Sequence, residues 1–444
     1  MSSRRPPYRD EQIAAALGAL DVPEHDDDFF KRLDQRLARP ATWRARAARR
    51  RRRRWLLSGV AVGGGILALV FLATRNSGVE QAEAAKIRGR VAATLASIRT
   101  IQGELTYRAT TPGTRQMSET RWWFALDAEG NFRLRQLGGP SDLAFDAKTG
   151  VERSLNTSAS LGSGRFYAER VGVAPGPPDA GPSTGILEPQ LVGVVQALRQ
   201  DHDPAIRDVI YQGRPAWRVL LNVRPNSIYP DVDRLRVTID KQSALPVAII
   251  ASLHRHLRSD TAISHLRLNR PLPPSVFTIH APQGVQVLKT REGFRYTSLA
   301  QAQARVDYRP LVPTQVPSGY RLNAVAVAKT AAATGAGGDN PRSHMVVSLS
   351  YRRGIEQFLV TTRLRGRPGV RWSDPISAGE GLVEPGRPVR FSAGALAGSR
   401  ATLVVSPRTG PHIWALTPSL VVTVSGDLSP AELIQIAGSL EPRS

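Results

Sequence analysis

The 444-residue sequence contains no cysteine, only six lysines and only three methionines. The absence of cysteine excludes disulfides, thiol catalysis, thiolate metal sites and a lipidated cysteine anchor. The motifs of serine hydrolases, zinc proteases and phosphate-binding loops are also absent from the sequence. We therefore expect no catalytic residues, no cofactor and no metal site, and we expect a protein that is not an enzyme.

Two histidines are the strongest candidates for metal ligands. His254 and His256 alternate on an expected strand, which places both on one face. Two imidazoles on one face could bind a metal ion, but the sequence places no third ligand near them. Arg258 follows at the same spacing, and its positive charge opposes a bound cation. A solvated strand face is therefore the preferred interpretation.

Basic residues outnumber acidic ones by 60 to 37, and the formal net charge is +23 at pH 7. Eight arginines lie between Arg44 and Arg54, directly before the uncharged run Trp55–Ala73. A helix of roughly 20 residues crosses a hydrocarbon core about 30 Å thick. Arginine on one side of such a run predicts that this side is cytoplasmic. We therefore expect a single transmembrane helix over 55–74 in a bacterial cell membrane, with the C-terminal domains outside.

The arginine run allows two other interpretations. A nucleic-acid-binding segment would need aromatic side chains among the arginines for base stacking, and there are none. A twin-arginine export signal would need a cleavage site such as "AEA" at 82–84, but a polar gap separates this site from the apolar run. We expect no nucleic-acid partner, and we expect the run to contact anionic lipid head groups.

The first 54 residues predict a small basic cytoplasmic tail. Apolar residues at helical spacing occur over 13–20 and again over 29–37, and Pro23 separates the two stripes. Three aspartates over 26–28 can cap the start of the second helix and suit its positive dipole end. These two short amphipathic helices could dock on a partner or lie loosely near the membrane.

Residues 79–300 predict an exported domain of mixed helix and sheet. An apolar helical stripe over 87–98 comes first, and strand-like alternation follows, as in 101–108 and 217–223. The segment Asp127–Asn131 has the composition of a hairpin turn. The pattern indicates many antiparallel strands with one solvent-exposed face, and few helices. It predicts an α+β fold, in which a strongly curved half-barrel sheet wraps over helices.

Residues 306–444 predict a smaller α+β domain. Several alternating strands precede a final helix, for which Ser429 is the expected N-cap and Pro430 the first helical residue. Glu432 lies three residues after Ser429, which is the spacing of a capping box.

Two segments near the end of the first domain resemble the LolA-like and RseB-like lipoprotein-binding fold. They are "DRLRVTIDKQSALPVAIIASL" at 233–253 and "LNRPLPPSVFTIHAPQGVQV" at 268–287. The Leu245–Pro246 turn and the residues Phe277, Pro282 and Gly284 match the closing strands of that fold. The resemblance covers roughly 79–290 and implies a lipid, lipoprotein or protein ligand.

The C-terminal domain resembles a small domain found on membrane-anchored sigma-factor regulators. The similar stretches are 313–325, 348–354 and 426–440, and the tail phrase at 21–37 is similar to the cytoplasmic starts of such regulators. The resemblance implies a sigma factor or another regulator as partner of the tail. A zinc-type anti-sigma mechanism is not supported, because its cysteine ligands are missing.

The concave side of a curved sheet can hold an acyl chain by apolar burial alone. The candidate lining residues are Ile87, Val91, Leu95, Ile98, Tyr107, Trp122, Phe124 and Trp217. The same side chains would equally suit a packed core, and the sequence does not decide between the two. The expected function is that of an extracytoplasmic sensor or regulator, and the alternative is a membrane-tethered lipid or lipoprotein carrier without a signalling role.

Overall fold

The computed structural model describes residues 82–110, 117–156, 165–174, 198, 204–222, 232–254, 256–329, 345–366, 372–379, 384–405 and 410–443. The chain divides into two units, Met1–Ala73 and Thr74–Ser444, and every described residue belongs to the second. The expected tail over 1–54 and the expected membrane span over 55–74 lie outside the described residues. Within the described ranges, no helix is long and apolar enough to cross a membrane.

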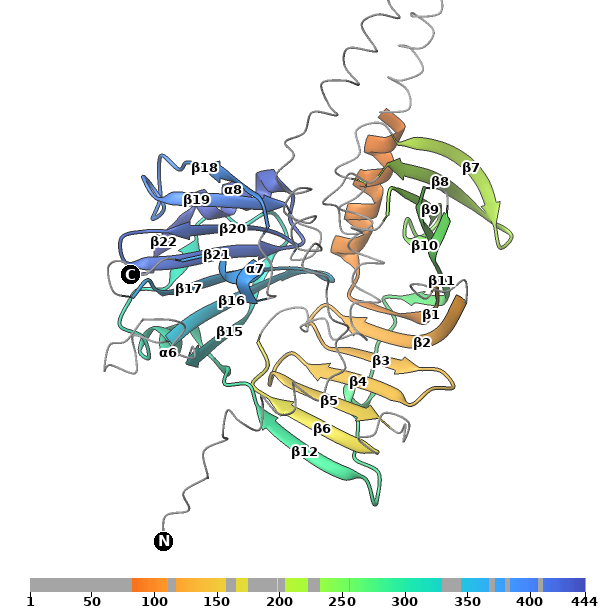
Figure 1. Ribbon diagram of the computed structural model, residues 1–444, viewed down its shortest axis with the longest axis horizontal. Helices are drawn as coiled ribbons and strands as arrows, with labels where there is room; N and C mark the ends of the chain where they lie inside the picture. Colours follow the sequence, from red (N-terminus) through yellow and green to blue (C-terminus); the bar gives the residue numbers. More distant parts are fainter. Residues whose placement is uncertain are drawn as a thin grey trace, which may run out of the picture. The chain divides into compact units, whose positions relative to one another are not determined.

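Twelve strands form the first sheet, in the order β12-β6-β5-β4-β3-β2-β1-β11-β10-β9-β8-β7 (Figure 1). These strands are β1 (Thr100–Thr110), β2 (Met117–Asp127), β3 (Phe132–Gln136), β4 (Ser141–Asp146), β5 (Val151–Asn156), β6 (Phe166–Val171), β7 (Ala205–Tyr211), β8 (Arg214–Asn222), β9 (Arg234–Asp240), β10 (Pro246–Leu253), β11 (His256–Leu268) and β12 (Gln286–Arg291). Most neighbours are joined by short hairpins, so the sequence order largely sets the spatial order.

The hairpin between β2 and β3 turns where the sequence predicts it. The carboxylate of Asp127 accepts hydrogen bonds from the backbone N–H groups of Glu129 and Asn131, at 3.0 and 2.9 Å. Gly130 has a φ of +97°, a conformation that favours glycine. The side chain of Asp127 thus holds the backbone of the turn in place, as short acidic side chains commonly do.

One long helix, residues 82–97, packs on one face of the first sheet. The side chains of its apolar stripe are at most 1% exposed. Ile98 continues the stripe just past the last helical residue. The stripe joins a cluster of buried side chains from β1, β2, β3, β8, β9, β10 and β11. We call the side of the sheet that meets this helix the inner face, and the opposite side the outer face.

The expectation of an antiparallel half-barrel in an α+β fold is wrong. Strands dominate the described residues of both domains, and the first sheet is mixed and open rather than closed into a barrel. β12 pairs in parallel with β6, from Gln286 beside Phe166 to Arg291 beside Val171. After β11 the chain crosses to the far edge of the sheet through a proline-rich segment, residues 269–285, so β12 arrives in the direction of β6. Within this segment, Pro274–Phe277 forms the short 3₁₀-helix η2 instead of a strand.

Eight further strands form the second sheet, in the order β13-β15-β16-β17-β21-β20-β19-β18, and β14 pairs separately with β22. The strands are β13 (Arg295–Thr297), β14 (Leu311–Pro313), β15 (Arg321–Lys329), β16 (Met345–Arg353), β17 (Glu356–Leu364), β18 (Gly386–Val389), β19 (Arg400–Val405), β20 (Pro411–Leu416), β21 (Leu420–Gly426) and β22 (Leu440–Pro442). The described helices that follow the first sheet are α6 (Leu299–Gln303), α7 (Pro375–Gly379) and α8 (Pro430–Gly438). The apolar stripe of α8 completes the core of this sheet.

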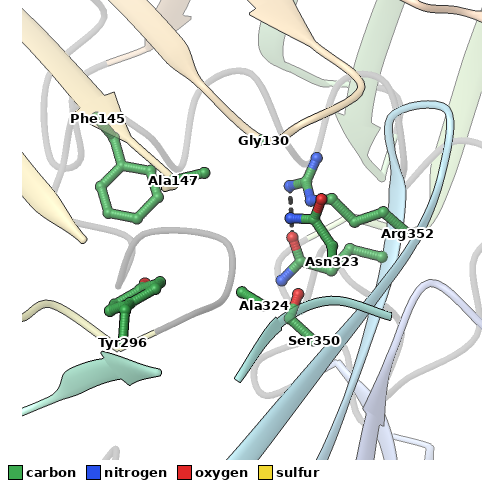
Figure 2. A pocket seen from close by; sticks show the side chains of 9 residues that line it. Gly130, Phe145, Ala147, Tyr296, Asn323, Ala324, Ser350 and Arg352 are labelled. Carbon is green, nitrogen blue, oxygen red and sulfur yellow. Dashed lines mark hydrogen bonds between the residues drawn. The ribbon is translucent and has the colours of Figure 1, made fainter. Parts of the chain in front are cut away.

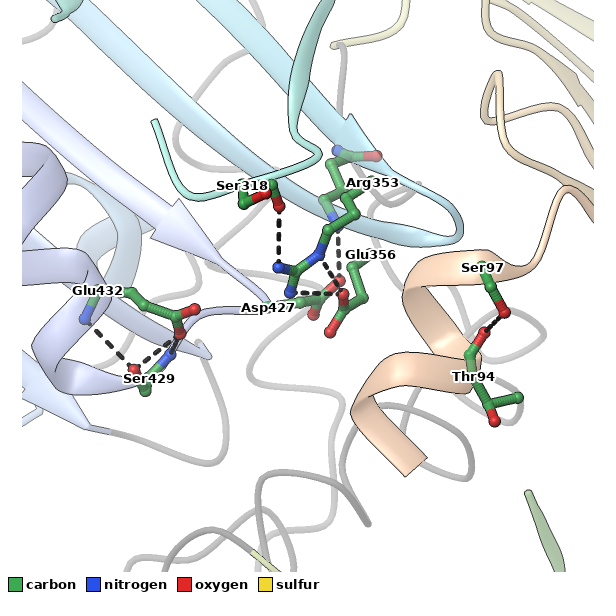
Figure 3. A network of polar contacts seen from close by, with 9 residues as sticks. Thr94, Ser97, Ser318, Arg353, Glu356, Asp427, Ser429 and Glu432 are labelled. Atoms are coloured by element: carbon green, nitrogen blue, oxygen red, sulfur yellow. Dashed lines mark hydrogen bonds and ion pairs between the residues drawn. The ribbon is translucent and has the colours of Figure 1, made fainter. Parts of the chain in front are cut away.

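The start of α8 confirms the capping box expected from the sequence. The hydroxyl of Ser429 accepts from the backbone N–H of Glu432 at 3.2 Å, and the backbone N–H of Ser429 donates to the Glu432 carboxylate at 2.7 Å (Figure 3). Two of the orphan N–H groups at the helix start are thereby satisfied. Pro430 is the first helical residue, where its missing N–H removes no hydrogen bond.

Candidate functional site

The eight residues expected to line a ligand groove come together on the inner face of the first sheet. Seven of them are buried, and Tyr107 is partly buried against the same cluster. The buried ones are Ile87, Val91, Leu95, Ile98, Trp122, Phe124 and Trp217. The structure thus confirms that these residues share one face, and their role in ligand binding stays a prediction.

Three polar side-chain atoms within this apolar face are buried without a hydrogen-bond partner. They are the hydroxyls of Thr120 and Thr261 and the indole N–H of Trp122. Strand register places two of them around Tyr107, because Tyr107 faces Thr120 on β2 and Thr261 on β11. Trp122 is two residues along β2 from Thr120, on the same face. We call Thr120, Trp122 and Thr261 the polar triad.

The polar triad is unusual in energetic terms. A buried donor or acceptor that has lost its water and gained no partner costs about 1–3 kcal/mol. Native proteins satisfy nearly all such groups, so each exception needs an explanation. Thr261 is only 1% exposed and Trp122 only 6%, so bulk water does not reach them freely. The inner face therefore combines apolar walls with hydrogen-bonding capacity that the described residues do not use.

Sequence reasoning identified Trp122 and missed Thr120 and Thr261. The alternation signal was present, because Thr120 shares the spacing of Trp122 and Phe124. Threonine is common on strands for its branched shape alone, however, so its type gave no hint of an unused hydroxyl. Only the cross-strand register brings Thr261, over 130 residues later in the chain, beside Tyr107.

At the other end of the inner face from the polar triad, two cationic side chains lie over the ring of Trp217. The guanidinium of Arg90 lies 4.9 Å from the ring centroid of Trp217, and the ammonium of Lys241 lies 5.3 Å from it. Arg90 also donates to the backbone carbonyl of Lys241 at 2.8 Å. Asp208 pairs with Lys241 at 2.7 Å. These contacts join the helix to β8 and β7. Trp217 therefore lies where cation–π, hydrogen-bond and ion-pair contacts hold the helix on the sheet, whereas the polar triad has buried atoms without hydrogen-bond partners.

A second buried polar cluster lies where turns of the first sheet meet the second sheet. A cavity of about 10 Å³, enough for roughly one water molecule, is lined by Gly130, Phe145, Tyr296, Asn323 and Arg352, among others (Figure 2). Burial lowers the pKa of Arg352 to about 10, while Asp427 and Asp127 oppose that shift.

This second cluster has few free hydrogen-bonding groups. Arg352 donates to the side-chain oxygen of Gln357, and Asn323 donates to the backbone carbonyl of Glu129 at 2.9 Å. The Tyr296 hydroxyl donates to the backbone carbonyl of Val173 at 3.2 Å. Only the side-chain nitrogen of Gln357 is buried without a partner here. The cluster therefore joins the two sheets around a cavity that has room for about one water molecule.

The turn between β16 and β17 makes a further contact between the second sheet and the helix 82–97. Arg353 donates to Glu356 at 2.8 Å and to the backbone carbonyl of Ser318 at 3.2 Å (Figure 3). Gly354 has a φ of +58°, and a Cβ there would lie 2.4 Å from the backbone oxygen of Leu95. The next residue, Ile355, packs into the inner-face cluster. The second sheet thus contacts the helix that covers the inner face.

The histidines weighed as metal ligands are both exposed. The ring of His254 lies 3.4 Å from the carboxylate of Asp233. Across the described ranges, no group of three histidine, cysteine or acidic side chains is arranged to hold a metal ion.

Comparison with known proteins finds no protein-family model and no curated protein that matches the chain. Solved structures do match. MucB is 15% identical over 82% of this chain and 98% of its own, with a TM-score of 0.29. The MucA/MucB complex of Pseudomonas aeruginosa is 15% identical over 82% of this chain and 99% of its own, with a TM-score of 0.28. A LolA superfamily protein from Nitrosomonas europaea is 12% identical over 43% of this chain and 96% of its own, with a TM-score of 0.21.

The matched structures thus include MucB and a LolA superfamily protein.

Proposed function

We propose that this chain is a non-enzymatic, extracytoplasmic sensor or regulator that binds an acyl-chain ligand on the inner face of the first sheet. The observation that carries the proposal is the polar triad. Three unused hydrogen-bonding atoms lie together in an otherwise apolar cluster, and a ligand with both an apolar and a polar part would satisfy them.

The chemistry of the two parts defines the ligand class. An acyl chain gains about 0.8 kcal/mol for each CH₂ group that it buries, so the apolar wall supplies affinity. The indole of Trp122 can only donate a hydrogen bond, whereas the threonine hydroxyls can donate or accept. A carbonyl oxygen fits such a set, and acyl chains carry one in esters and amides. A lipid or the acylated end of a lipoprotein has this composition.

Ligand entry requires movement of the helix 82–97. Its stripe already fills the inner face, with Leu95 only 1% exposed, so a ligand must part the helix from the strands. The helix is also the described element closest in sequence to the tail. Displacing it is therefore a physical route by which ligand binding could alter the region before it. The regulator role rests on this route together with the two apolar stripes expected in the tail.

Two conservative substitutions test the ligand site. Trp122→Phe keeps an aromatic ring and removes the N–H, and Thr261→Val keeps the side-chain shape and removes the hydroxyl. In the full chain, both should weaken binding of a fluorescent fatty-acyl ester by about two- to ten-fold, the range of one neutral hydrogen bond. Thr261→Val should not lower the melting temperature, because it removes a buried hydroxyl that has no partner in the free protein. Trp122→Phe also removes part of a buried ring, so it should lower the melting temperature somewhat.

Thr238→Val is the matched control for the ligand test. Thr238 is also buried, but it faces Arg218 on the outer face of the same sheet. This variant should bind the acyl ester like the wild type. Absence of ester binding by the wild type, or equal effects of all three variants, would refute the proposal.

The regulator role needs a separate experiment. Phe29→Ala combined with Leu33→Ala in the tail should release a bound sigma factor or other regulator, measured by pull-down, without changing affinity for the acyl ester. If the ester binds and no partner is recovered with the wild-type tail, the chain is a carrier without a signalling role.

A further inference from the structure

Four exposed arginines gather on the outer face of β7, β8 and β9. Arg207 on β7 lies directly opposite Arg218 on β8 in the strand register. Arg236 on β9 is diagonal to Arg218, because its direct partner is Leu220. Arg234 follows two residues away on the same face of β9. All four are exposed, and we call this set the arginine face.

The arginine face differs from the other half of the sheet. On β1 to β6, arginines lie beside carboxylates, as in Arg108 with Glu119 at 2.7 Å, Arg133 with Asp142 at 2.7 Å and Arg170 with Glu152 at 2.9 Å. No described carboxylate lies within ion-pair distance of any member of the arginine face. Asp208, adjacent to Arg207 in sequence, sits on the inner side of β7 and pairs with Lys241.

Directly opposed like charges on neighbouring strands destabilise a sheet. Direct partners have Cβ atoms about 4.5–5.5 Å apart, and diagonal ones about 7–8 Å. The positive charges of the arginine face are thus closely spaced and uncompensated, and their exposure rules out a role in the core. A closely spaced set of guanidinium groups is the arrangement that binds multiple phosphates.

The edge strand β7 carries two further side chains next to these charges, one on each face of the sheet. Ile210 on β7 is 69% exposed, the highest exposure among the large hydrophobic side chains that the structure describes. Tyr211 follows it, and β7 is the last strand of the sheet, so its outer edge has no strand partner in the described structure. Ile210 lies on the inner side of β7, two residues from Asp208, whereas the partly exposed Tyr211 shares the outer face with Arg207. A tyrosine beside several basic side chains suits the boundary between phospholipid head groups and acyl chains.

We propose that the arginine face and the neighbouring edge of β7 dock on the surface of an anionic phospholipid bilayer. The arginines bind the head-group phosphates, and Tyr211 lies at the level of the head groups. This interaction surface is distinct from the inner face and does not depend on the ligand proposed above. Docking would hold the inner face near the lipid source without any change in the fold.

The test holds the full chain in phosphatidylcholine nanodiscs through the expected span 55–74, and measures its capture of vesicles of phosphatidylglycerol and phosphatidylcholine, and of vesicles of phosphatidylcholine alone. Residues 49–54 are changed from arginine to glutamine in every sample, so that this run does not mask the arginine face. Each arginine near an anionic surface strengthens partitioning roughly five-fold. Arg207→Gln with Arg218→Gln should therefore weaken binding to the anionic vesicles by about 25-fold. Added salt should weaken binding of the parent protein to the same vesicles.

Arg387→Gln with Arg400→Gln is the matched control, because it removes the same charge from two exposed arginines of the second sheet. It should change vesicle binding by less than about two-fold if binding is local. Melting temperatures should not fall in either double variant, since all four side chains are exposed. Equal weakening by both pairs would mean that net charge alone drives binding, and would overturn the proposal. So would an absence of binding to anionic vesicles, or preferential binding to a soluble polyanion such as heparin.

Discussion

The guanidinium of Arg352 lies against the backbone of Gly130. A Cβ placed on Gly130 would be only 2.6 Å from the guanidinium carbon of Arg352. Gly130 belongs to the turn between β2 and β3 of the first sheet, and Arg352 to β16 of the second. A residue without a side chain therefore makes room for the buried cation that joins the two sheets.

Gly130→Ala should destabilise the protein by about 2–3 kcal/mol. The positive φ accounts for roughly 1 kcal/mol, and displacement of Arg352 from Gln357 for the rest. Gly213→Ala is the control, because Gly213 has a φ of +75° with open space around it. Urea denaturation should give a cost of only about 1 kcal/mol for this control. Equal costs at the two positions would contradict the importance of the Arg352 contact.

Stability should depend on pH through Asp374, which contacts the buried ring of His412 at 2.7 Å. Burial acts to raise the pKa of Asp374, but hydrogen bonds from His412 and Ser377 hold it below its ordinary value. A lowered pKa in the folded state means that the ionised carboxylate stabilises folding at neutral pH. This contribution is lost as the pH falls through the folded pKa, below about 4.

Asp374→Asn should therefore cost about 1.5–3 kcal/mol at pH 7, the range of a charge-assisted hydrogen bond. The difference from the wild type should shrink as the pH is lowered from 5 to 3, as followed by denaturant titrations. Ser377→Ala, which removes one of the two hydrogen bonds that lower the pKa and keeps the carboxylate, should show a pH dependence between those of the wild type and Asp374→Asn. A difference that stays constant with pH would argue against a stabilising ionised carboxylate at Asp374.

Leu95→Ala should cost about 2–5 kcal/mol, because Leu95 is fully packed between the helix 82–97 and the first sheet. Ser97→Ala, on the exposed side of the same helix, should change stability by less than about 0.5 kcal/mol. The free energy of unfolding of both variants is the measurement. A small cost at Leu95 would mean that the helix covers the inner face only loosely in the free protein.

Ser429→Ala should remove the capping box of α8 and cost about 1 kcal/mol. The companion variant is Ser298→Ala, which removes the same box from the five-residue helix α6. Because α8 buries its stripe in the core of the second sheet, we expect the larger loss in melting temperature at Ser429. Equal losses would show that the cap acts locally, whatever its helix packs against.

The sequence alone determined most local structure of the described part of the chain. The turn at Asp127–Asn131 and the cap at Ser429 follow from side chains that bond to nearby backbone, so their geometry is encoded within a few residues. Periodicity likewise determined which side chains share a face, including all eight inner-face candidates. These features depend on separations of two to four residues, which the order of amino acids displays directly.

Only the tertiary structure decided the features that join distant segments. The parallel pairing of β12 with β6 depends on a crossing of the whole sheet, and alternation of side chains does not specify direction. The polar triad and the arginine face arise from register between strands, which sequence spacing within one strand cannot give. Burial of Arg352 against Gly130 required two sheets to meet. In each case the deciding quantity is a distance between residues far apart in the chain, because packing and not local preference sets it.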